Sequence, residues 1–328
     1  MDTGTHIVMG IAIGTIATID PVVSSHPETA KAIMIGALIG SQAPDLDTIL
    51  KLKNNAKYIK NHRGITHSIP AVILWPILIS GIIYLFLPEA SLFHLWLWTF
   101  LAVILHVFVD IFNAYGTQAL RPFTKKWIAL GIINTFDAFI FGMHIFGLIL
   151  WAFGFSPQYT FLVIYVILIG YYVLRYQMQQ NVLKKVKSMI PSSKSIIISP
   201  TIHFNQWHLA ITTDQNFYVA RAVLNKIIIH DTFEKVPLPD NAIIAAAKLD
   251  DNVAAFLSFS PVYRWEMEEY SDHYEVRFID LRYRSKGFYP FVAVVQLDFD
   301  LNIVSSYTGW IFSEEKLRSK LDLIPNET

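Results

Sequence analysis

The chain has 328 residues, of which 53% are hydrophobic and only 16% are charged. This composition is too apolar for one ordinary soluble fold, so we expect a membrane protein. The formal net charge at pH 7 is zero, which gives no reason to expect a nucleic-acid partner. The absence of cysteine excludes disulfides, thiolate metal sites and cysteine nucleophiles, and it leaves histidine and carboxylates as the strong metal ligands. The first ten residues lack the basic region and cleavage site of a secretory signal peptide, so we expect them to be retained.

Apolar segments recur through the first half of the chain. They are Ile7–Ile19, Ala30–Ala43, Ile69–Leu87, Leu92–Phe112, Ala138–Phe155 and Tyr159–Tyr172. The last four approach or reach the roughly 20 residues that a membrane-spanning helix needs, whereas the first two are shorter. The sequence therefore predicts an α-helical membrane bundle with four to six spans.

Toward the C-terminus, short segments with alternating apolar and polar residues replace the long apolar runs. In "FVAVVQLDFD", Val295, Leu297 and Phe299 alternate with polar residues. The segment "YEVRFIDLRYR" also alternates, but its apolar parity shifts between Phe278 and Ile279, which predicts a β-bulge. We therefore expect a helical membrane domain with a metal site over residues 1–175, a basic linker over 176–194 and a soluble β-rich domain over 195–328.

The lysines and arginines between the apolar segments are unevenly distributed. They lie in residues 45–67, in residues 113–137 and after residue 174, whereas the connections 20–29, 88–91 and 154–158 contain none. Cytoplasmic loops of membrane proteins carry an excess of lysine and arginine. We therefore expect an integral protein of the bacterial cell membrane whose basic loops and β-rich domain face the cytoplasm.

The same topology places a set of polar residues at one membrane face. They stand at the ends of successive segments and are His6, Asp45, Asp47, His62, His67, His106, Asp110 and Asp137. Within "ILHVFVDIF", His106 and Asp110 are four residues apart, so both project from one helix face with about 6 Å between them. That spacing suits chelation of one cation. It equally suits a hydrogen bond between the two side chains that stabilises the helix.

Taken singly, the other polar residues also allow structural roles. His6 could be a histidine at a helix start, and "PDLD" could form a turn and a helix cap. However, four separate segments supply histidine or aspartate to the same membrane face in a chain without cysteine. This coincidence favours a joint metal site over a set of unrelated structural roles.

Four blocks of the chain resemble the signature blocks of the membrane-bound, metal-dependent hydrolase family described as YdjM-like. They are "GTHIVMG", "APDLD", "NHRGITHS" and "HVFVDIFNAYGTQALRPF", in this order and within about residues 4–140. The β-rich tail resembles the tail that one subgroup of the family carries. The resemblance implies a metal-dependent hydrolase at the membrane and names no substrate.

A looser similarity reaches zinc-dependent phospholipase C and the related nucleases, which bind metals through an early His, an Asp, a further His and a helical His-x-x-x-Glu. The residues that match this pattern in order are His6, Asp45, His67, His106 and Asp110, with Asp in place of Glu. This ligand set suits one or two divalent transition ions such as Zn²⁺, which lower the pKa of bound water toward about 7. The pattern also includes an amino-terminal ligand and a second helical His-x-x-x-Glu pair. Met1 precedes His6 by five residues and no second pair occurs, so we do not expect a full three-metal cluster.

Further polar residues near the expected site could act on the substrate or on the ligands. Asp47, His62 or Asp137 could orient a ligand or accept a proton from water, and the sequence does not rank them. We assign neither His94 nor His144 to the site, because one lies at the opposite face and the other lies inside a span.

Two arginines and an asparagine are candidates for substrate binding. Arg63 and Arg121 could pair with phosphate oxygens, or they could only hold their loops on the cytoplasmic side. Asn113 could form a hydrogen bond to the substrate, and it also suits the turn that leaves the helix.

The interfacial position of the ligands among basic residues favours an anionic substrate beside the lipid bilayer. A phospholipid or another phosphoester fits this description, and a soluble phosphoester or an amide is also compatible. A transporter would use the same residues as an ion path, but inverted repeats and mid-membrane ionisable groups are not evident. A non-catalytic regulator would keep the metal as a brace while the β-rich domain bound a protein partner, which the sequence does not identify.

Overall fold

The computed structural model describes residues 1–52, 54–224 and 226–322. They form two compact units. The first unit contains residues 1–47, 62–181 and 200–204, and the second contains residues 48–61, 182–199 and 205 onward.

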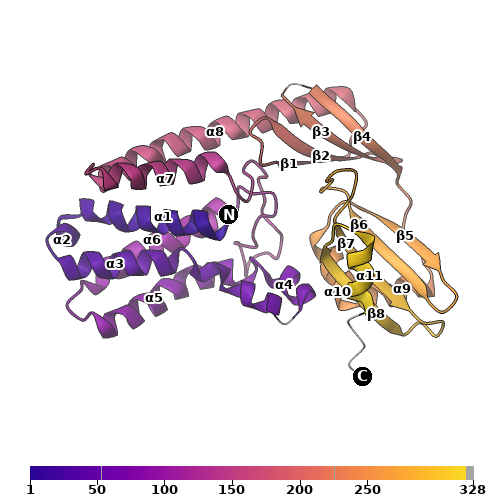
Figure 1. Ribbon diagram of the computed structural model, residues 1–328, viewed down its shortest axis with the longest axis horizontal. Helices are drawn as coiled ribbons and strands as arrows, with labels where there is room; N and C mark the ends of the chain where they lie inside the picture. The colour runs from indigo at the N-terminus through magenta and orange to yellow at the C-terminus, as the bar shows by residue number, and fades with distance from the viewer. Residues whose placement is uncertain (53, 225, 323–328) are drawn as a thin grey trace. The chain divides into compact units, whose positions relative to one another are not determined.

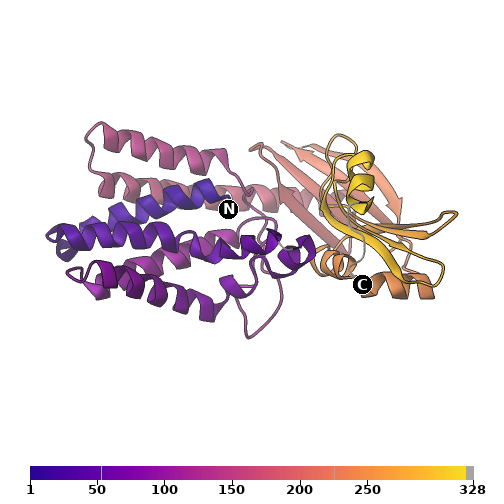
Figure 2. The same cartoon turned by 60° about the horizontal axis from the view of Figure 1, so that its bottom comes forward.

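The long helices of the first unit lie alongside one another (Figure 1, Figure 2). In chain order they are α1 Thr3–Ile16, α3 Pro27–Gly40, α5 Ile69–Phe86, α6 Leu92–Asp110, α7 Ala138–Ala152 and α8 Pro157–Met189. The short α2 and three 3₁₀ segments connect them, namely α2 Pro21–Ser24, η1 Ala17–Ile19, η2 Ala43–Leu52 and η3 Ile65–His67. Helix α3 packs against α1, α5 and α6, and α1 also contacts α6 and α7. The expected helical bundle is therefore confirmed.

Helices α5, α6 and α8 are long and apolar enough to cross a membrane. Helix α7 and the segment Thr3–Ile19 are apolar but shorter. Helix α7, which we expected to extend to Phe155, ends at Ala152, and Gly154 follows with a φ of 87°. A left-handed residue just past a helix is a common way to end it. The number of spans stays a prediction.

The close approach of α1 and α3 brings the first two polar blocks together. A Cβ atom on Gly10 would lie 2.5 Å from Ser41 Oγ and 3.0 Å from the carbonyl oxygen of Ala37. Only glycine fits there, because any side chain would separate the helices. His6 lies one helical turn before Gly10, so the contact places it beside the end of α3 and the residues that follow it.

Helix α8 is 33 residues long and continues through residues 176–189, where we expected a linker. Arg175 is 1% exposed, and its Nε donates a hydrogen bond to the carbonyl oxygen of Ile132 over 3.0 Å. The Nε2 of Gln179 also donates to the loop before α7, at Leu130. These contacts hold residues 175–179 of α8 within the first unit, whereas the last turns of the helix, from residue 182, belong to the second unit.

The C-terminal part contains two four-stranded antiparallel sheets, each with its strands in chain order (Figure 1). The first sheet contains β1 Ser195–Pro200, β2 Gln206–Thr212, β3 Asn216–Val223 and β4 Lys226–Glu234. The second contains β5 Tyr263–Glu269, β6 Tyr274–Asp280, β7 Phe291–Leu297 and β8 Ile303–Trp310. Three helices accompany the second sheet, namely α9 Ala242–Leu249, α10 Asp251–Phe259 and α11 Glu314–Asp322. The expected β-rich domain is confirmed.

The second sheet is covered on both faces, which explains the shifted parity in its sequence. Phe278 packs in one core cluster with Phe256 of α10, whereas Ile279 packs in another with Leu317 of α11. Strand β6 pairs with β5 and β7 without interruption at this point, so the predicted bulge is wrong. A strand that is buried on both faces need not alternate.

Helix α4, Asn55–Asn61, folds with the second unit although it lies between two polar blocks of the first unit in the sequence. It packs against α10, and Ile59 contacts the core beneath the second sheet. Asn55 Nδ2 donates a hydrogen bond over 3.1 Å to the carbonyl oxygen of Thr308 in β8. The C-terminal domain therefore includes a segment of the membrane half of the chain.

Candidate metal centre

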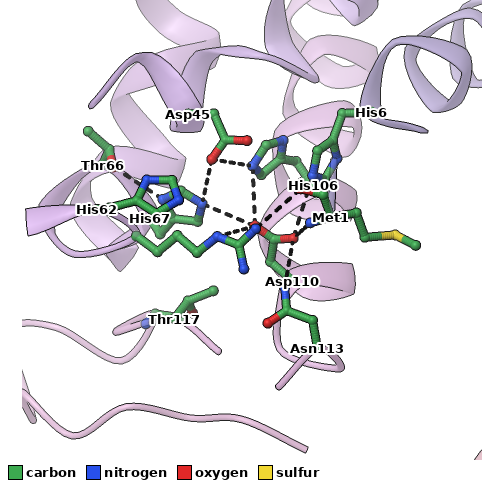
Figure 3. A network of polar contacts seen from close by, with 12 residues as sticks. Met1, His6, Asp45, His62, Thr66, His67, His106, Asp110, Asn113 and Thr117 are labelled. Carbon is green, nitrogen blue, oxygen red and sulfur yellow. Dashed lines mark hydrogen bonds and ion pairs between the residues drawn. The ribbon is translucent and has the colours of Figure 1, made fainter. Parts of the chain in front are cut away.

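The five predicted metal ligands converge on one place (Figure 3). His6 lies in the first turns of α1, Asp45 lies in η2, and His67 ends η3. His106 and Asp110 lie in the last turns of α6. The structure thus brings together side chains from four separate segments, as the sequence predicted.

The Nε2 atoms of His67 and His106 lie at similar distances from one oxygen of Asp45 and one oxygen of Asp110. The Nε2 of His67 lies 3.4 Å from Asp110 Oδ2 and 3.6 Å from Asp45 Oδ1. The Nε2 of His106 lies 3.7 Å from Asp110 Oδ2 and 3.6 Å from Asp45 Oδ1. Each of these separations exceeds the ordinary length of a hydrogen bond. The four side chains therefore face one another without being bonded to one another.

These separations fit a shared cation. Two ligand atoms that each lie about 2.1 Å from a tetrahedral ion are about 3.4 Å apart. The Nε2 atoms of His67 and His106 and one oxygen each of Asp45 and Asp110 are buried and make no hydrogen bond. Buried polar atoms of this kind are costly unless a partner satisfies them. The donor set of Asp45, His67, His106 and Asp110 therefore fits a divalent transition ion.

His6 adjoins this set from the other side of Asp110. Its Nε2 lies 3.5 Å from Asp110 Oδ1, and its ring stacks on the His106 ring with 3.7 Å between the centroids. Both ring nitrogens of His6 are buried without a hydrogen-bond partner. The two oxygens of the Asp110 carboxylate therefore face different imidazoles, and Oδ1 also contacts the amino nitrogen of Met1.

The outer nitrogens of two candidate ligands, His67 and His106, are held by hydrogen bonds. His106 Nδ1 lies 2.6 Å from the carbonyl oxygen of Ser41, which can only accept, so Nδ1 carries the proton. His67 Nδ1 lies 3.1 Å from Thr66 Oγ1, which donates its own hydrogen to Asp47 Oδ2 over 2.7 Å. Both arrangements leave Nε2 with its lone pair directed at the cluster, as metal-binding histidines require.

Asp47 holds the loop that carries His67. Its carboxylate accepts hydrogen bonds from His62 Nδ1 over 2.8 Å, from the Arg63 backbone N–H over 2.8 Å and from Thr66 Oγ1. Asp45, Asp47 and His62 are also close enough to form a second metal-binding group. Because the Asp47 carboxylate already accepts three hydrogen bonds, we assign it to positioning and not to ligation.

Arg63 is buried beside the cluster. Its side chain is 4% exposed, and its Nε lies 3.2 Å from Asp110 Oδ2. Its backbone has a φ of 58°, which is uncommon outside glycine and is held here by the hydrogen bond to Asp47. The guanidinium places a fixed positive charge next to the ligand atoms.

The electrostatics of Asp45 and His67, the two candidate ligands in the 3₁₀ segments, favour metal binding. Burial disfavours the charged form of Asp45, but the neighbouring His106 and the charge of Arg63 outweigh burial and hold the pKa of Asp45 well below its ordinary value. Burial, followed by the charge of His106, holds the pKa of His67 well below its ordinary value. At neutral pH Asp45 is therefore a carboxylate and His67 a neutral imidazole, and these are the ligating forms.

The remaining predicted residues lie farther from the cluster or have structural partners. Asn113 Oδ1 accepts hydrogen bonds from the N–H groups of Tyr115 and Gly116, so it shapes the turn after α6. Asp137 caps α7 and also accepts a hydrogen bond from the Tyr171 hydroxyl over 2.9 Å. Among the described residues, no contact joins the Arg121 side chain to the five ligands.

Met1 and Thr66 are part of the site although sequence reasoning left them out. The amino nitrogen of Met1 contacts Asp110 Oδ1, and both side chains are fully buried. The five-residue separation of Met1 from His6 in the sequence gives no indication of this contact. The cap that Asp2 provides to α1 turns the chain back, with Asp2 N–H donating to the carbonyl oxygen of Thr135 over 2.9 Å. Arg63 Nη2 also donates a hydrogen bond to the carbonyl oxygen of Met1 over 3.2 Å. These contacts are all long-range, so no local signal could have revealed the position of Met1.

Three family models match successive parts of the chain. Residues 1–182 match the YdjM inner membrane protein, residues 191–233 match the YfhP middle domain, and residues 242–321 match the YfhP C-terminal alpha/beta plait domain. The chain is 64% identical to the uncharacterized protein YfhP of Bacillus subtilis (strain 168) over 98% of this chain and 99% of that protein. No solved structure matches the chain, and the similarity to zinc-dependent phospholipase C stays a prediction from the ligand order. The chain therefore belongs to the YdjM inner membrane protein family and carries the two additional YfhP domains.

Proposed function

We propose that the protein is a membrane-bound, metal-dependent hydrolase that cleaves a phosphoester at the cytoplasmic face of the membrane. The observation that carries the proposal is the convergence of buried nitrogen and oxygen atoms from His67, His106, Asp45 and Asp110 that lack hydrogen-bond partners. A bound divalent ion, for which Zn²⁺ is the first candidate, would satisfy these atoms, polarise a phosphoryl oxygen and lower the pKa of water.

The charge of the site favours an anionic substrate. The carboxylates of Asp45 and Asp110 offset the charge of one divalent ion, and Arg63 then adds a further positive charge beside Asp110. Arginine forms strong, charge-assisted hydrogen bonds with phosphate oxygens. The buried Arg63 guanidinium therefore supports a phosphoester over a neutral amide as the substrate.

His62 is the best candidate for the proton acceptor. Asp47 accepts the hydrogen bond from His62 Nδ1, which fixes the tautomer and leaves Nε2 as a base. The His62 side chain is 23% exposed, and its ring centroid lies 6.5 Å from that of the ligand His67. Of the three residues that the sequence left unranked, Asp47 then positions His62, and Asp137 serves as a helix cap.

Access to the cluster supports catalysis over a purely structural metal. The side chains of His6, His67, His106 and Asp110 have no exposed surface, whereas that of Asp45 is 17% exposed. We propose that a substrate approaches from the Asp45 side, because Asp45 has the one side chain of the five with exposed surface. A metal that only braced the bundle, as in a non-catalytic regulator, would need no such opening.

The test is hydrolysis by the purified full-length protein in lipid nanodiscs. The protein is loaded with Zn²⁺ or Mn²⁺ and supplied with a soluble phosphodiester, a soluble phosphomonoester and phospholipids in turn. We expect metal-dependent release of phosphate or a phosphorylated product, and its loss in His106→Gln and Asp45→Asn. If the metal-loaded protein cleaves none of these substrates, or if both variants retain the full rate, the proposal is wrong.

A further inference from the structure

Basic side chains gather where the first sheet of the C-terminal domain contacts the second. The contact is a small apolar core, in which Ala210 and Val219 of the first sheet pack against Val262 and Leu281. The ionisable residues beside this core are His208, Arg221, His230, Asp231 and Arg284. None of them belongs to the candidate metal centre.

The register of β2, β3 and β4 places three of these side chains on one face of the first sheet. His208 is directly opposite Arg221, and opposite residues of an antiparallel pair project to the same face. Val219 lies two residues before Arg221 and is opposite Asp231, so Asp231 shares this face. A β-bulge beside Val219 produces this register and leaves His230 without an opposite residue in β3. The bulge thus brings a carboxylate to the face that carries His208 and Arg221.

The loop after β6 completes the group from the second sheet. Arg284 Nε donates a hydrogen bond to Asp231 Oδ2 over 2.5 Å, and the Tyr289 hydroxyl donates to the same oxygen over 2.6 Å. The Asp231 carboxylate is therefore already paired. The side chains of Arg284 and Asp231 are 22% and 30% exposed, so a solute can reach the group from solvent.

Arg221 has no counterion among the described residues. Its Nε is buried without a hydrogen-bond partner, and no ion pair joins its guanidinium to a described carboxylate. Burial, followed by the charge of Arg221, lowers the pKa of His208, and Arg284 acts in the same sense. Burial, followed by the charges of Arg284 and Arg221, lowers the pKa of His230. Both arginines thus lie close to the same histidines, and a buried donor in such surroundings is unfavourable unless an acceptor binds there.

We propose that His208, Arg221, His230 and Arg284 form a binding site for a phosphate group, either free phosphate or the phosphoryl group of a larger molecule. Arginine binds phosphate oxygens through charge-assisted, often bidentate hydrogen bonds. The tetrahedral oxygens of phosphate suit donors that arrive from three strands and a loop, whereas a planar carboxylate offers only two oxygens. The inference does not depend on the proposed function, because no residue of the site belongs to the metal centre.

The test is a calorimetric titration of the full-length protein in nanodiscs with inorganic phosphate at constant ionic strength. A chelator is present, so that metal does not contribute to phosphate binding. We expect saturable binding that weakens at least about tenfold in Arg221→Gln, the effect of losing a hydrogen bond between charged groups. The matched control is Lys226→Gln, because Lys226 is an exposed cation of the same hairpin outside the site. Equal phosphate affinity in Arg221→Gln and Lys226→Gln would overturn the inference.

Hydrogen exchange of β2 and β3 peptides separates anion binding from a structural role of Arg221. Without phosphate, Arg221→Gln removes a repulsive charge and should exchange no faster than the unmodified protein. Phosphate should slow exchange in the unmodified protein and have little effect in the variant. Faster exchange of the variant in phosphate-free buffer would assign Arg221 a structural role and overturn the inference, and so would equal protection of the unmodified protein by sodium chloride.

Two further comparisons complete the test. If Arg221→Gln does not fold, Arg221→Lys decides, because lysine keeps the charge but lacks the planar fork. A reduced phosphate affinity in Arg221→Lys then supports the inference, and an unchanged affinity overturns it. Phenyl phosphate that binds more tightly than phosphate would identify a phosphorylated molecule as the ligand, and the reverse order would identify the free anion. Acetate that binds as tightly as phosphate would contradict the choice of a phosphate group.

Discussion

Asp47 Oδ1 accepts a hydrogen bond from His62 Nδ1 over 2.8 Å, and this bond joins the two ends of a segment that folds elsewhere. The fourteen residues between them, 48–61, belong to the compact unit of the C-terminal domain. The same carboxylate also holds the backbone of Arg63 and the hydroxyl of Thr66. One side chain therefore orients the candidate base, the candidate phosphate-binding arginine and the loop before His67.

We expect Asp47→Asn to lower the rate of phosphoester hydrolysis by about 10–100-fold, because outer partners of metal ligands usually contribute that much. An amide presents an N–H group where the carboxylate accepts a hydrogen bond, so His62 loses its fixed tautomer. The metal content should remain near that of the unmodified protein. Steady-state kinetics and elemental analysis of the same sample measure both quantities, and a loss of metal in parallel with the rate would assign Asp47 to ligation instead.

A double-mutant cycle tests whether Asp47 acts through His62. His62→Gln alone should lower the rate by at least as much as Asp47→Asn, and the combined variant should be little worse than His62→Gln. Residues that act as one unit are not additive. Additive losses would mean that Asp47 contributes mainly through Arg63 or Thr66.

The metal site predicts a sharp difference between two histidines of one helix. His106→Gln removes a ligand and should reduce bound Zn²⁺ at least tenfold after equilibration and desalting. His94→Gln is the matched control, because His94 lies on the same helix, roughly 18 Å from His106, and pairs with Asp20 over 3.4 Å. Similar Zn²⁺ contents in the two variants would contradict the assignment.

Removal of the metal should also destabilise the helical unit. A ligand present at 100 times its Kd stabilises the folded state by about 2.7 kcal/mol. Treatment with a chelator should therefore lower the thermal midpoint of the unmodified protein and have little effect on His106→Gln. An equal shift in both would indicate that the chelator acts on something other than this site.

The convergence of the candidate ligands was predictable from the sequence because its signals are local and periodic. The i, i+4 spacing of His106 and Asp110 and the positions of the other ligands at segment ends place them on one face of the membrane. Contacts between distant segments produce no local pattern in the sequence. Met1 is placed beside Asp110 by the hydrogen bond of Asp2 to Thr135 and by that of Arg63 to the Met1 carbonyl oxygen. Thr66 joins the distant Asp47 to the adjacent His67.

The same limit applies to the fold. Hydropathy located the long helices, but it could not show that residues 55–61 form a helix of the C-terminal unit. Ile59 packs against the core of that unit, and this contact joins residues far apart in the sequence. The parity shift at Phe278 and Ile279 signalled a bulge because a strand with two buried faces and a bulged strand give the same pattern. Helices α9 and α10 cover one of those faces and were not anticipated.

Asp137 should matter for stability and not for metal binding. Its carboxylate accepts hydrogen bonds from two N–H groups of α7 and from the Tyr171 hydroxyl. Asp137→Ala should therefore destabilise the helical unit by about 1 kcal/mol or more through loss of the cap. Thermal unfolding and Zn²⁺ analysis check this prediction. A variant that kept its stability but lost its Zn²⁺ would show that Asp137 contributes to metal binding.

The first sheet should lose stability at mildly acidic pH because of His208. Burial, followed by the charges of Arg221, His230 and Arg284, lowers the pKa of His208 from 6.5 to about 4. The unfolded chain therefore takes up a proton near pH 6.5 while the folded sheet resists it, so stability falls as the pH decreases from 6.5 toward 4. Hydrogen exchange of β2 peptides should show opening that is easier at pH 5 than at pH 7 by on the order of 1–2 kcal/mol after discounting for partial exposure. In His208→Gln this dependence should be markedly smaller, and an unchanged pH profile would assign it to other groups.

The final prediction concerns orientation, which the distribution of lysine and arginine places with the basic loops in the cytoplasm. The structure adds a constraint, because α4 packs against α10, so the loop that contains α4 and the C-terminal domain lie on the same side of the membrane.

The chain contains no cysteine, so single cysteines can be introduced and labelled selectively. Position 57 is preferable to position 55, because Lys57 is exposed whereas the Asn55 side chain is bonded to Thr308. A maleimide that cannot cross the membrane should label Lys57→Cys only after the cells are opened, whereas Ser25→Cys, in the exposed connection after α2, should react in intact cells. Labelling of position 57 in intact cells would place the metal centre and the C-terminal domain outside the cytoplasm, and the charge-based orientation would then be wrong.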